Sequence, residues 1–186
     1  MTQRPGLFPF IASPLAALFV GLAVSAAPSS SPLAMDSGGT STTSTPNCPK
    51  GSVWDKKSKK CVVANSGAVT DDVLVEEGRR LAKAGQYENA IAVLQAVSRE
   101  DPVGLTYLGY SHRKLGEIDR GIAYYKQALA IDPKNADTRE YLGEGYVASG
   151  RTDLARLELA EVEKLCGTSC EQYGELAAAI EGKATD

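Results

Sequence analysis

The stretch Val103–Asp132, VGLTYLGYSHRKLGEIDRGIAYYKQALAID, decides the fold of this chain. Its first half has packing residues at the i, i+3, i+4, i+7 spacing of one helix face: Leu105, Leu108, Gly109 and His112. Its second half has another such stripe: Ile122, Tyr125, Ala128 and Leu129. Gly116 separates the two stripes, where the residue after a helix often needs positive φ. Two helices joined by so short a turn lie antiparallel, so this stretch predicts a helical hairpin.

The same unit recurs before and after this stretch. The segments KAGQYENAI, KLGEIDRGI and ASGRTDLAR align on Gly85, Gly116 and Gly150. The last two units are 34 residues apart, whereas the first two are 31 apart, roughly one helical turn fewer. Small residues recur where the two helices of each unit would touch: Gly78/Ala90, Gly109/Gly121 and Gly143/Ala155. The chain therefore contains an internal repeat.

On these markers, residues 71–169 resemble three tetratricopeptide repeats (TPRs), whose period is about 34 residues. The resemblance implies an all-α, TPR-type helical solenoid of three helix–turn–helix repeats. In the first repeat we expect helices over 73–84 and 88–98. The segment LCGTSCEQYGELAAAI (165–180) contains a last apolar helix face: Tyr173, Leu176, Ala177 and Ile180. This face predicts a C-terminal capping helix. We expect the TPR domain, including this helix, to span 71–186. In this arrangement the chain resembles small exported bacterial TPR proteins.

The first 47 residues are not expected to belong to the folded domain. Residues 1–27 are typical of a signal peptide, with Arg4 followed by an apolar run and small residues at Val24–Ala27. Cleavage would place the protein in the periplasm or outside the cell. An uncleaved segment anchored in the inner membrane is the alternative. Residues 28–47 are rich in Ser, Thr, Pro and Gly, which predicts a disordered linker.

Four cysteines in two close pairs predict two local disulfides in an exported chain. Cys48 and Cys61 would close a Lys-rich hairpin over 48–64, with Val53-Trp54 facing Val62-Val63. Cys166 and Cys170 would staple the capping helix to the repeats. A thiol–disulfide redox protein that uses Cys166 and Cys170 remains an alternative interpretation.

Charge is distributed unevenly along the chain. The Cys48–Cys61 loop carries five Lys and one Asp, whereas the part from Asp71 onward carries 14 Lys/Arg and 21 Asp/Glu. The loop could contact an anionic cell-envelope surface, or its lysines could only keep a small hairpin soluble. The loop is too short and the chain too acidic to favour nucleic-acid binding.

The sequence favours a binding protein over an enzyme. The single histidine, His112, occupies a packing position, and we expect no catalytic residue, no metal site and no cofactor. The carboxylates Glu140 and Glu144 are spaced i, i+4 like many surface pairs.

By alignment to TPRs, the first helix of each repeat lines a groove that holds a peptide or a partner helix. The outward-facing groove positions predicted here are Val75, Arg79, Thr106, Tyr110, Arg113, Glu140 and Glu144. Tyrosine and arginine are frequent binding anchors. We therefore expect a protein–protein interaction scaffold with an unidentified protein or peptide partner. Attachment or spacing at the cell envelope through the Lys-rich hairpin is the alternative, and a homodimer through the array is left open.

Overall fold

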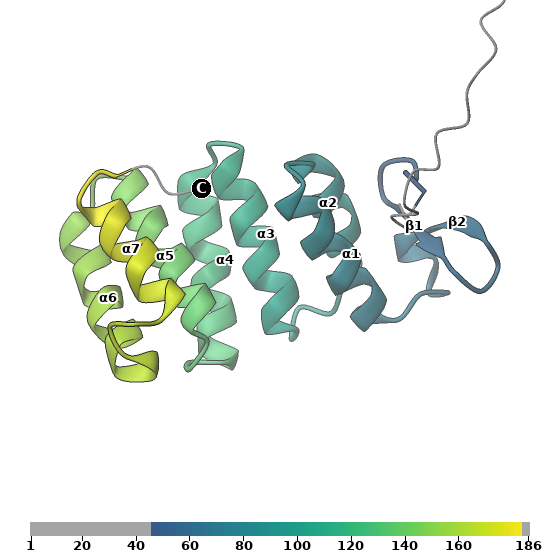
Figure 1. The fold of residues 1–186 in the computed structure, drawn as a ribbon. Coiled ribbons are helices and arrows are strands. Elements are labelled where there is room, and N and C mark those ends of the chain that lie inside the picture. The colour runs from purple at the N-terminus through teal and green to yellow at the C-terminus, as the bar shows by residue number, and fades with distance from the viewer. Residues whose placement is uncertain (1–45, 184–186) are drawn as a thin grey trace, which may run out of the picture. The chain divides into compact units, whose positions relative to one another are not determined.

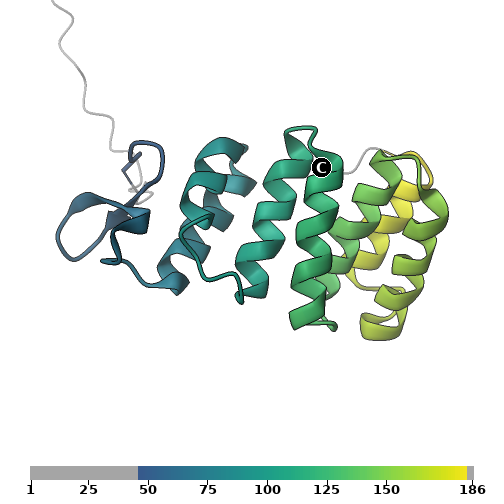
Figure 2. The same cartoon turned by 180° about the vertical axis from the view of Figure 1, so that it is seen from behind.

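The computed structural model describes residues 46–183, which form a small β-hairpin followed by seven helices (Figures 1 and 2). The hairpin consists of β1 (Ser52–Asp55) and β2 (Lys60–Val63), and a short 3-10 turn, η1 (Ala64–Ser66), follows it. The helices are α1 (Asp71–Lys83), α2 (Tyr87–Leu94), α3 (Pro102–Lys114), α4 (Ile118–Ile131), α5 (Ala136–Ala148), α6 (Thr152–Cys166) and α7 (Glu171–Ile180).

The helices pair in chain order into three repeats, α1 with α2, α3 with α4 and α5 with α6, and α7 packs on α5 and α6. The turns inside the repeats pass through Gly85, Gly116 and Gly150, whose φ angles are +74°, +85° and +75°. Residues other than glycine rarely adopt such angles, which explains why these three glycines mark the repeat. The structure thus confirms the predicted fold class, three TPR-type repeats with a capping helix, preceded by a disulfide-closed hairpin.

The two helices of the middle repeat approach each other closely at Gly109 and Gly121. A Cβ atom added to Gly121 would lie 2.8 Å from the carbonyl oxygen of Gly109. A Cβ atom added to Gly109 would lie 2.7 Å from the ring of Tyr125. In the third repeat the corresponding glycine, Gly143, receives the side chain of Leu176 from α7 instead. The small residues therefore make room both for helix pairing and for the capping helix.

Helix α2 is shorter than predicted. It ends at Leu94 instead of Ser98, because the amides of Ala96 and Val97 donate to the carbonyls of Val93 and Leu94 over 3.1 Å each. The amide of Ser98 then donates to the carboxylate of Asp71, also over 3.1 Å. The turn that is missing from the 31-residue spacing is thus removed from the end of α2.

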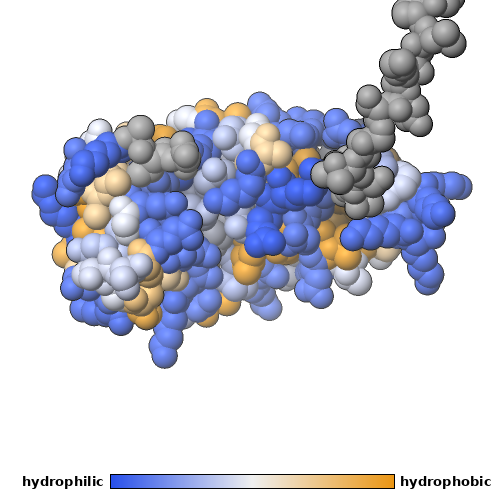
Figure 3. All heavy atoms as spheres, viewed as in Figure 1, coloured by the Kyte–Doolittle hydropathy of each residue, from blue (hydrophilic) through white to orange (hydrophobic). Residues whose placement is uncertain are grey.

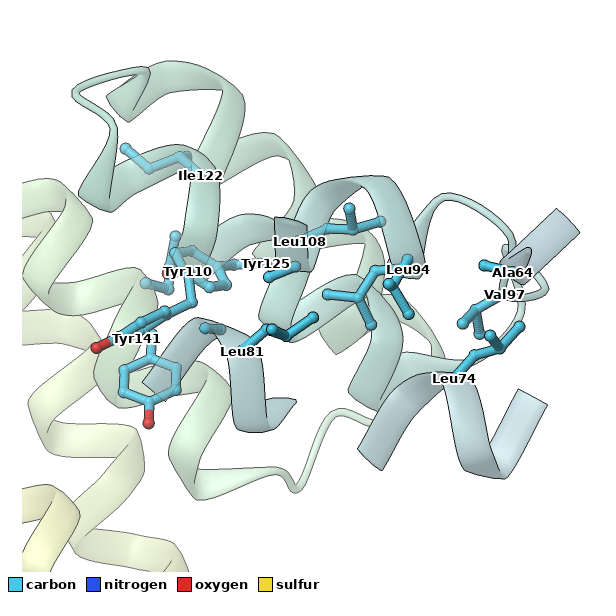
Figure 4. Close-up of a cluster of buried hydrophobic side chains, with 14 of the residues drawn as sticks. Ala64, Leu74, Leu81, Leu94, Val97, Leu108, Tyr110, Ile122, Tyr125 and Tyr141 are labelled. Carbon is cyan, nitrogen blue, oxygen red and sulfur yellow. The ribbon is translucent and has the colours of Figure 1, made fainter. Parts of the chain in front are cut away.

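The hairpin covers the face of the first repeat that lies away from α3. Val53 pairs with Val62 across the hairpin, as predicted, and Cys48 and Cys61 form a disulfide with a Cα–Cα distance of 5.6 Å. Val53 and Ala64 are almost fully buried in the core that contains Leu74 and Leu94 of α1 and α2. Figure 4 shows this core running continuously from Ala64 to Tyr141. The hairpin therefore acts as a cap for the first repeat.

The predicted signal peptide (1–27) and almost all of the predicted linker (28–47) lie outside the described residues. Between residues 46 and 183 no helix is both long and apolar enough to cross a membrane.

Candidate functional site: the face formed by α1, α3 and α5

The first helices of the three repeats share a layer of aromatic and cationic side chains, called here the tyrosine layer: Lys83, Tyr107, Tyr110, Arg113 and Tyr141. The ring centroid of Tyr110 lies 5.2 Å from that of Tyr141 and 6.3 Å from that of Tyr107. The Nζ atom of Lys83 lies 5.1 Å from the ring centroids of both Tyr110 and Tyr141, within the range of cation–π attraction. Lys83 also donates a 2.7 Å hydrogen bond to the hydroxyl of Tyr141.

Arg113 joins the tyrosine layer to the carboxylates of α5. Its guanidinium lies 5.6 Å from the ring centroid of Tyr110, and its Nε donates to the hydroxyl of Tyr125 over 3.3 Å. It also forms an ion pair with Glu144, and both side chains are about nine-tenths buried. This buried ion pair joins α3 to α5, and removing one partner would be costly because the other charge would be left away from water.

A second cluster, called here the acidic corner, lies between α5 and α7: Asp137, Glu140, Glu144 and Glu175. Glu140 is only 3% exposed. Its burial, together with repulsion from Glu144 and Glu175, raises the pKa of Glu140 to about 9. The Oε1 atom of Glu140 is buried and has no hydrogen-bond partner among residues 46–183. At neutral pH this carboxyl group is therefore protonated.

The structure corrects the expectation that all seven predicted groove residues face outward. Thr106, Tyr110, Glu140 and Glu144 are buried, and the side chain of Arg113 is only 10% exposed. The reason is close packing of neighbouring first helices, shown by the 2.7 Å contact between the hydroxyls of Thr106 and Thr138.

The two remaining predicted residues belong to α1. Val75 is half-buried and lies 3.6 Å from the position of a Cβ atom on Gly104 of α3. Arg79 is exposed over half of its side chain and lies close enough to Tyr107 to hydrogen-bond to its hydroxyl. The structure thus brings Tyr110, Arg113 and Glu144 together, but it leaves Val75 and Arg79 apart from them.

The accessible side chains over these buried groups are ones that were not predicted for the groove. They are Lys83, Tyr107, Asp137 and Glu175, which are exposed or partly exposed. Tyr107 and Tyr141 are 34 residues apart, so they hold the same position in consecutive repeats. This recurrence of tyrosine is a sequence signal that could have identified both residues as part of this face.

Comparisons with known proteins agree with this architecture. Two family profiles, each described as "Tetratricopeptide repeat", match residues 75–136 and 112–180, which together make up more than half of the chain. The chain is a TPR protein. Among solved structures it is similar to the one titled "Crystal structure of MamA", with a TM-score of 0.53 and 21% sequence identity. That similarity covers 60% of this chain and 67% of the other, and it shows the fold alone. No curated protein matches this TPR chain significantly.

Among residues 46–183, hollows also occur on other surfaces, and two of them are described here. One, of about 280 Å³, is lined by the segment after the early end of α2 and by α3 and α4. The other, of about 590 Å³, lies between the hairpin and α1 and is lined by Trp54, Val69 and Val73 among others. None of the seven predicted groove residues lines either hollow.

His112 and the second disulfide have structural positions in the TPR array. The His112 ring is buried, stacks on Tyr124 at 5.3 Å, and places Nδ1 2.9 Å from the Glu117 carboxylate. Burial, aided by the charge of Arg120, lowers the pKa of His112, so its ring is neutral at neutral pH. The predicted disulfide between Cys166 and Cys170 is present and joins the end of α6 to the start of α7.

Proposed function

We propose that this TPR protein is an exported scaffold that binds a peptide or a helix of a partner protein on the face formed by α1, α3 and α5. The observation that carries the proposal is the tyrosine layer, in which buried rings from α3 and α5 support accessible groups at Lys83 and Tyr107. The exposed Arg79 lies beside Tyr107 at the edge of this layer. Tyrosine and arginine supply much of the binding energy in protein interfaces.

The physical basis of binding is preorganisation. The accessible Lys83 and Tyr107 are held against the buried rings of Tyr110 and Tyr141 before any partner arrives. A partner therefore does not have to order these side chains, which lowers the entropy cost of association. Charge also varies along the face: Arg79 and Lys83 lie on α1, whereas Asp137 and Glu175 lie on α5 and α7. This gradient favours one direction for a bound peptide.

Affinity capture from an envelope extract tests this proposal, with residues 28–186 as bait. The double variant Arg79→Glu/Tyr107→Ala changes accessible side chains of the face and leaves the buried Tyr110 and Arg113 intact. The control variant, Arg156→Glu, makes the same charge change at an exposed position on α6. We expect a protein that is retained by the native bait and by the control and is lost with the double variant. Equal capture by all three baits would refute binding at this face.

The Lys-rich hairpin supports a second candidate function, contact with an anionic envelope surface. Its lysines are all exposed: Lys50, Lys56, Lys57, Lys59 and Lys60. Figure 3 shows hydrophilic side chains projecting from the end of the molecule that carries the hairpin. Salt-sensitive sedimentation with envelope fractions, lost when Lys56, Lys57, Lys59 and Lys60 are changed to Glu, would favour this function over the scaffold.

The proposed location, periplasmic or secreted, rests on the sequence of residues 1–27. Fractionation of cells that produce the full chain tests it. A shortened protein in the soluble periplasmic or extracellular fraction is expected, whereas a full-length protein in the membrane fraction would indicate an uncleaved anchor.

A further inference from the structure

We propose that the acidic corner binds a lysine or arginine side chain of the partner peptide, and that Glu140 releases its proton when this cation binds. The inference rests on the proposed function, because it names the chemistry that one end of the binding face recognises. It arises from four carboxyl groups on two helices, one of which is buried with an oxygen that lacks a partner among the described residues.

The cations that reach this part of α5 already have other contacts. Arg113 from α3 pairs with Glu144, and Lys83 from α1 bonds to Tyr141. Arg139 of α5 itself pairs with Glu158 of α6 over 2.8 Å. From α4, Lys126 lies 5.7 Å from the ring centroid of Tyr146.

The groups that act most strongly on Glu140 are other acids. They are Glu144 and Asp137 on its own helix and Glu175 on α7. One carboxylate oxygen of the acidic corner, Oδ1 of Asp137, already accepts a 2.6 Å hydrogen bond from Gln172 of α7. The corner therefore has an excess of carboxyl groups that a cation from outside the chain would balance.

A ligand can approach Glu140 from the side of the exposed carboxylates. Asp137 and Glu175 are exposed, and Glu175 interacts directly with Glu140. Glu175 is the exposed member of this pair, so it is the carboxylate through which a cation would approach Glu140. An ammonium or guanidinium group has several N–H donors, so it can bond to Glu140 and to the carboxylates above it at once.

The release of a proton from Glu140 follows from the change in charge around this carboxyl group when a cation binds. In the free protein the Glu140 carboxyl is neutral, since its burial and its acidic neighbours raise its pKa to about 9. A cation within hydrogen-bonding distance favours the carboxylate form. The O–H bond of Glu140 then breaks, its proton passes to solvent, and the resulting carboxylate pairs with the bound cation. No oxidant, reductant or other reactant is needed.

Isothermal titration calorimetry with the peptide acetyl-Lys-Lys-Lys-Lys-amide tests the inference. Titrations at pH 7 in phosphate and in Tris, whose ionisation enthalpies differ, report the number of protons released per peptide bound. We expect net proton release from the native protein. Glu140→Gln keeps the size of the side chain and removes the proton, so it should abolish the release and weaken binding by about tenfold, the loss of one charged contact. Glu163→Gln, an exposed change on α6, should alter neither result.

Two results would overturn the inference: peptide binding without proton release, or equal affinity of Glu140→Gln and the native protein. Failure of the peptide to bind at all would overturn it as well. The capture experiment with Arg79→Glu/Tyr107→Ala concerns α1 and α3, so the proposed function can hold while this inference fails, and the two failures are distinguishable.

Discussion

Lys83, in the first repeat, donates a 2.7 Å hydrogen bond to the hydroxyl of Tyr141, in the third repeat, 58 residues further along the chain. In most repeat arrays each repeat contacts only its neighbours, so that stability is close to a sum of local terms. This bond passes over the second repeat, in contact with the ring of Tyr110. It therefore couples two repeats that are not consecutive.

A double-mutant cycle of Lys83→Met and Tyr141→Phe measures that coupling. We expect an interaction free energy of about 0.5–1.5 kcal/mol in urea unfolding, as for a typical net hydrogen bond between partly buried groups. Lys164→Met is the control for Lys83→Met, because Lys164 bonds to Glu161 within its own helix. Strict additivity of the Lys83 and Tyr141 variants would mean that the bond contributes no stability.

Arg113→Met should destabilise the protein by about 3–5 kcal/mol, because it removes the cation beside the buried Glu144 carboxylate. Adding Glu144→Gln to this variant should restore part of the loss, since the carboxylate charge is then gone as well. Chemical unfolding of both variants measures the difference. A cost of less than about 1 kcal/mol for Arg113→Met would show that water reaches the pair.

Glu140 makes the stability of the fold depend on pH. Its pKa is about 9 in the folded protein, against an ordinary value of 4.5. A raised pKa in the folded state stabilises the protein fully below the unfolded value and less as pH rises toward the folded value. Unfolding free energy should therefore fall between about pH 5 and pH 9.

Glu140→Gln should remove this dependence and stabilise the protein at pH 8 by on the order of 2–4 kcal/mol. Urea unfolding at several pH values measures it, with Glu163→Gln as the control that should retain the native slope. An unchanged slope in Glu140→Gln would show that another group causes the dependence.

Gly109→Ala and Gly174→Ala make the same substitution inside two helices, one at a crowded position and one at an open position. The added methyl group on Gly109 would meet Tyr125 at 2.7 Å, whereas on Gly174 it would meet nothing within 4 Å. We expect Gly109→Ala to lower the melting temperature, at a cost of about 1–3 kcal/mol from overpacking. Gly174→Ala should raise the melting temperature, because the higher helix propensity of alanine adds up to about 1 kcal/mol to the unfolding free energy. Similar effects of both changes would mean that the helix pair can separate without loss.

The repeats could be predicted from the sequence because the residues that mark them are required by the backbone geometry of the turns. Gly85, Gly116 and Gly150 hold positive φ angles, and such a requirement is visible in the residue type itself. The end of α2 was predicted too late because Leu94 and Val97 continue the helical spacing of apolar residues. What ends the helix is a set of tighter turns and a contact from Ser98 to Asp71, 27 residues away.

For the candidate binding face, the sequence could predict which helices form it but not which of their side chains are exposed. Helical spacing places Tyr110 and Glu140 on the first helices of their repeats, but it does not say how closely these helices approach. That distance decides burial, and Thr106 against Thr138 shows how small it is. The packing of the hairpin on α1 and α2 was likewise not predictable, since the alternation around Val53 indicates a buried strand face without naming what covers it.

Both ends of the repeat array are closed. Val53 and Ala64 fill the face that a repeat before α1 would use, and Leu176 of α7 fills the face that a repeat after α6 would use. Each of these caps carries its own disulfide, between Cys48 and Cys61 or between Cys166 and Cys170. End-to-end stacking of copies into a filament would require a cap to detach. Direct stacking of the repeats of one copy on those of another is therefore blocked, and residues 46–183 of each copy present three repeats between the caps.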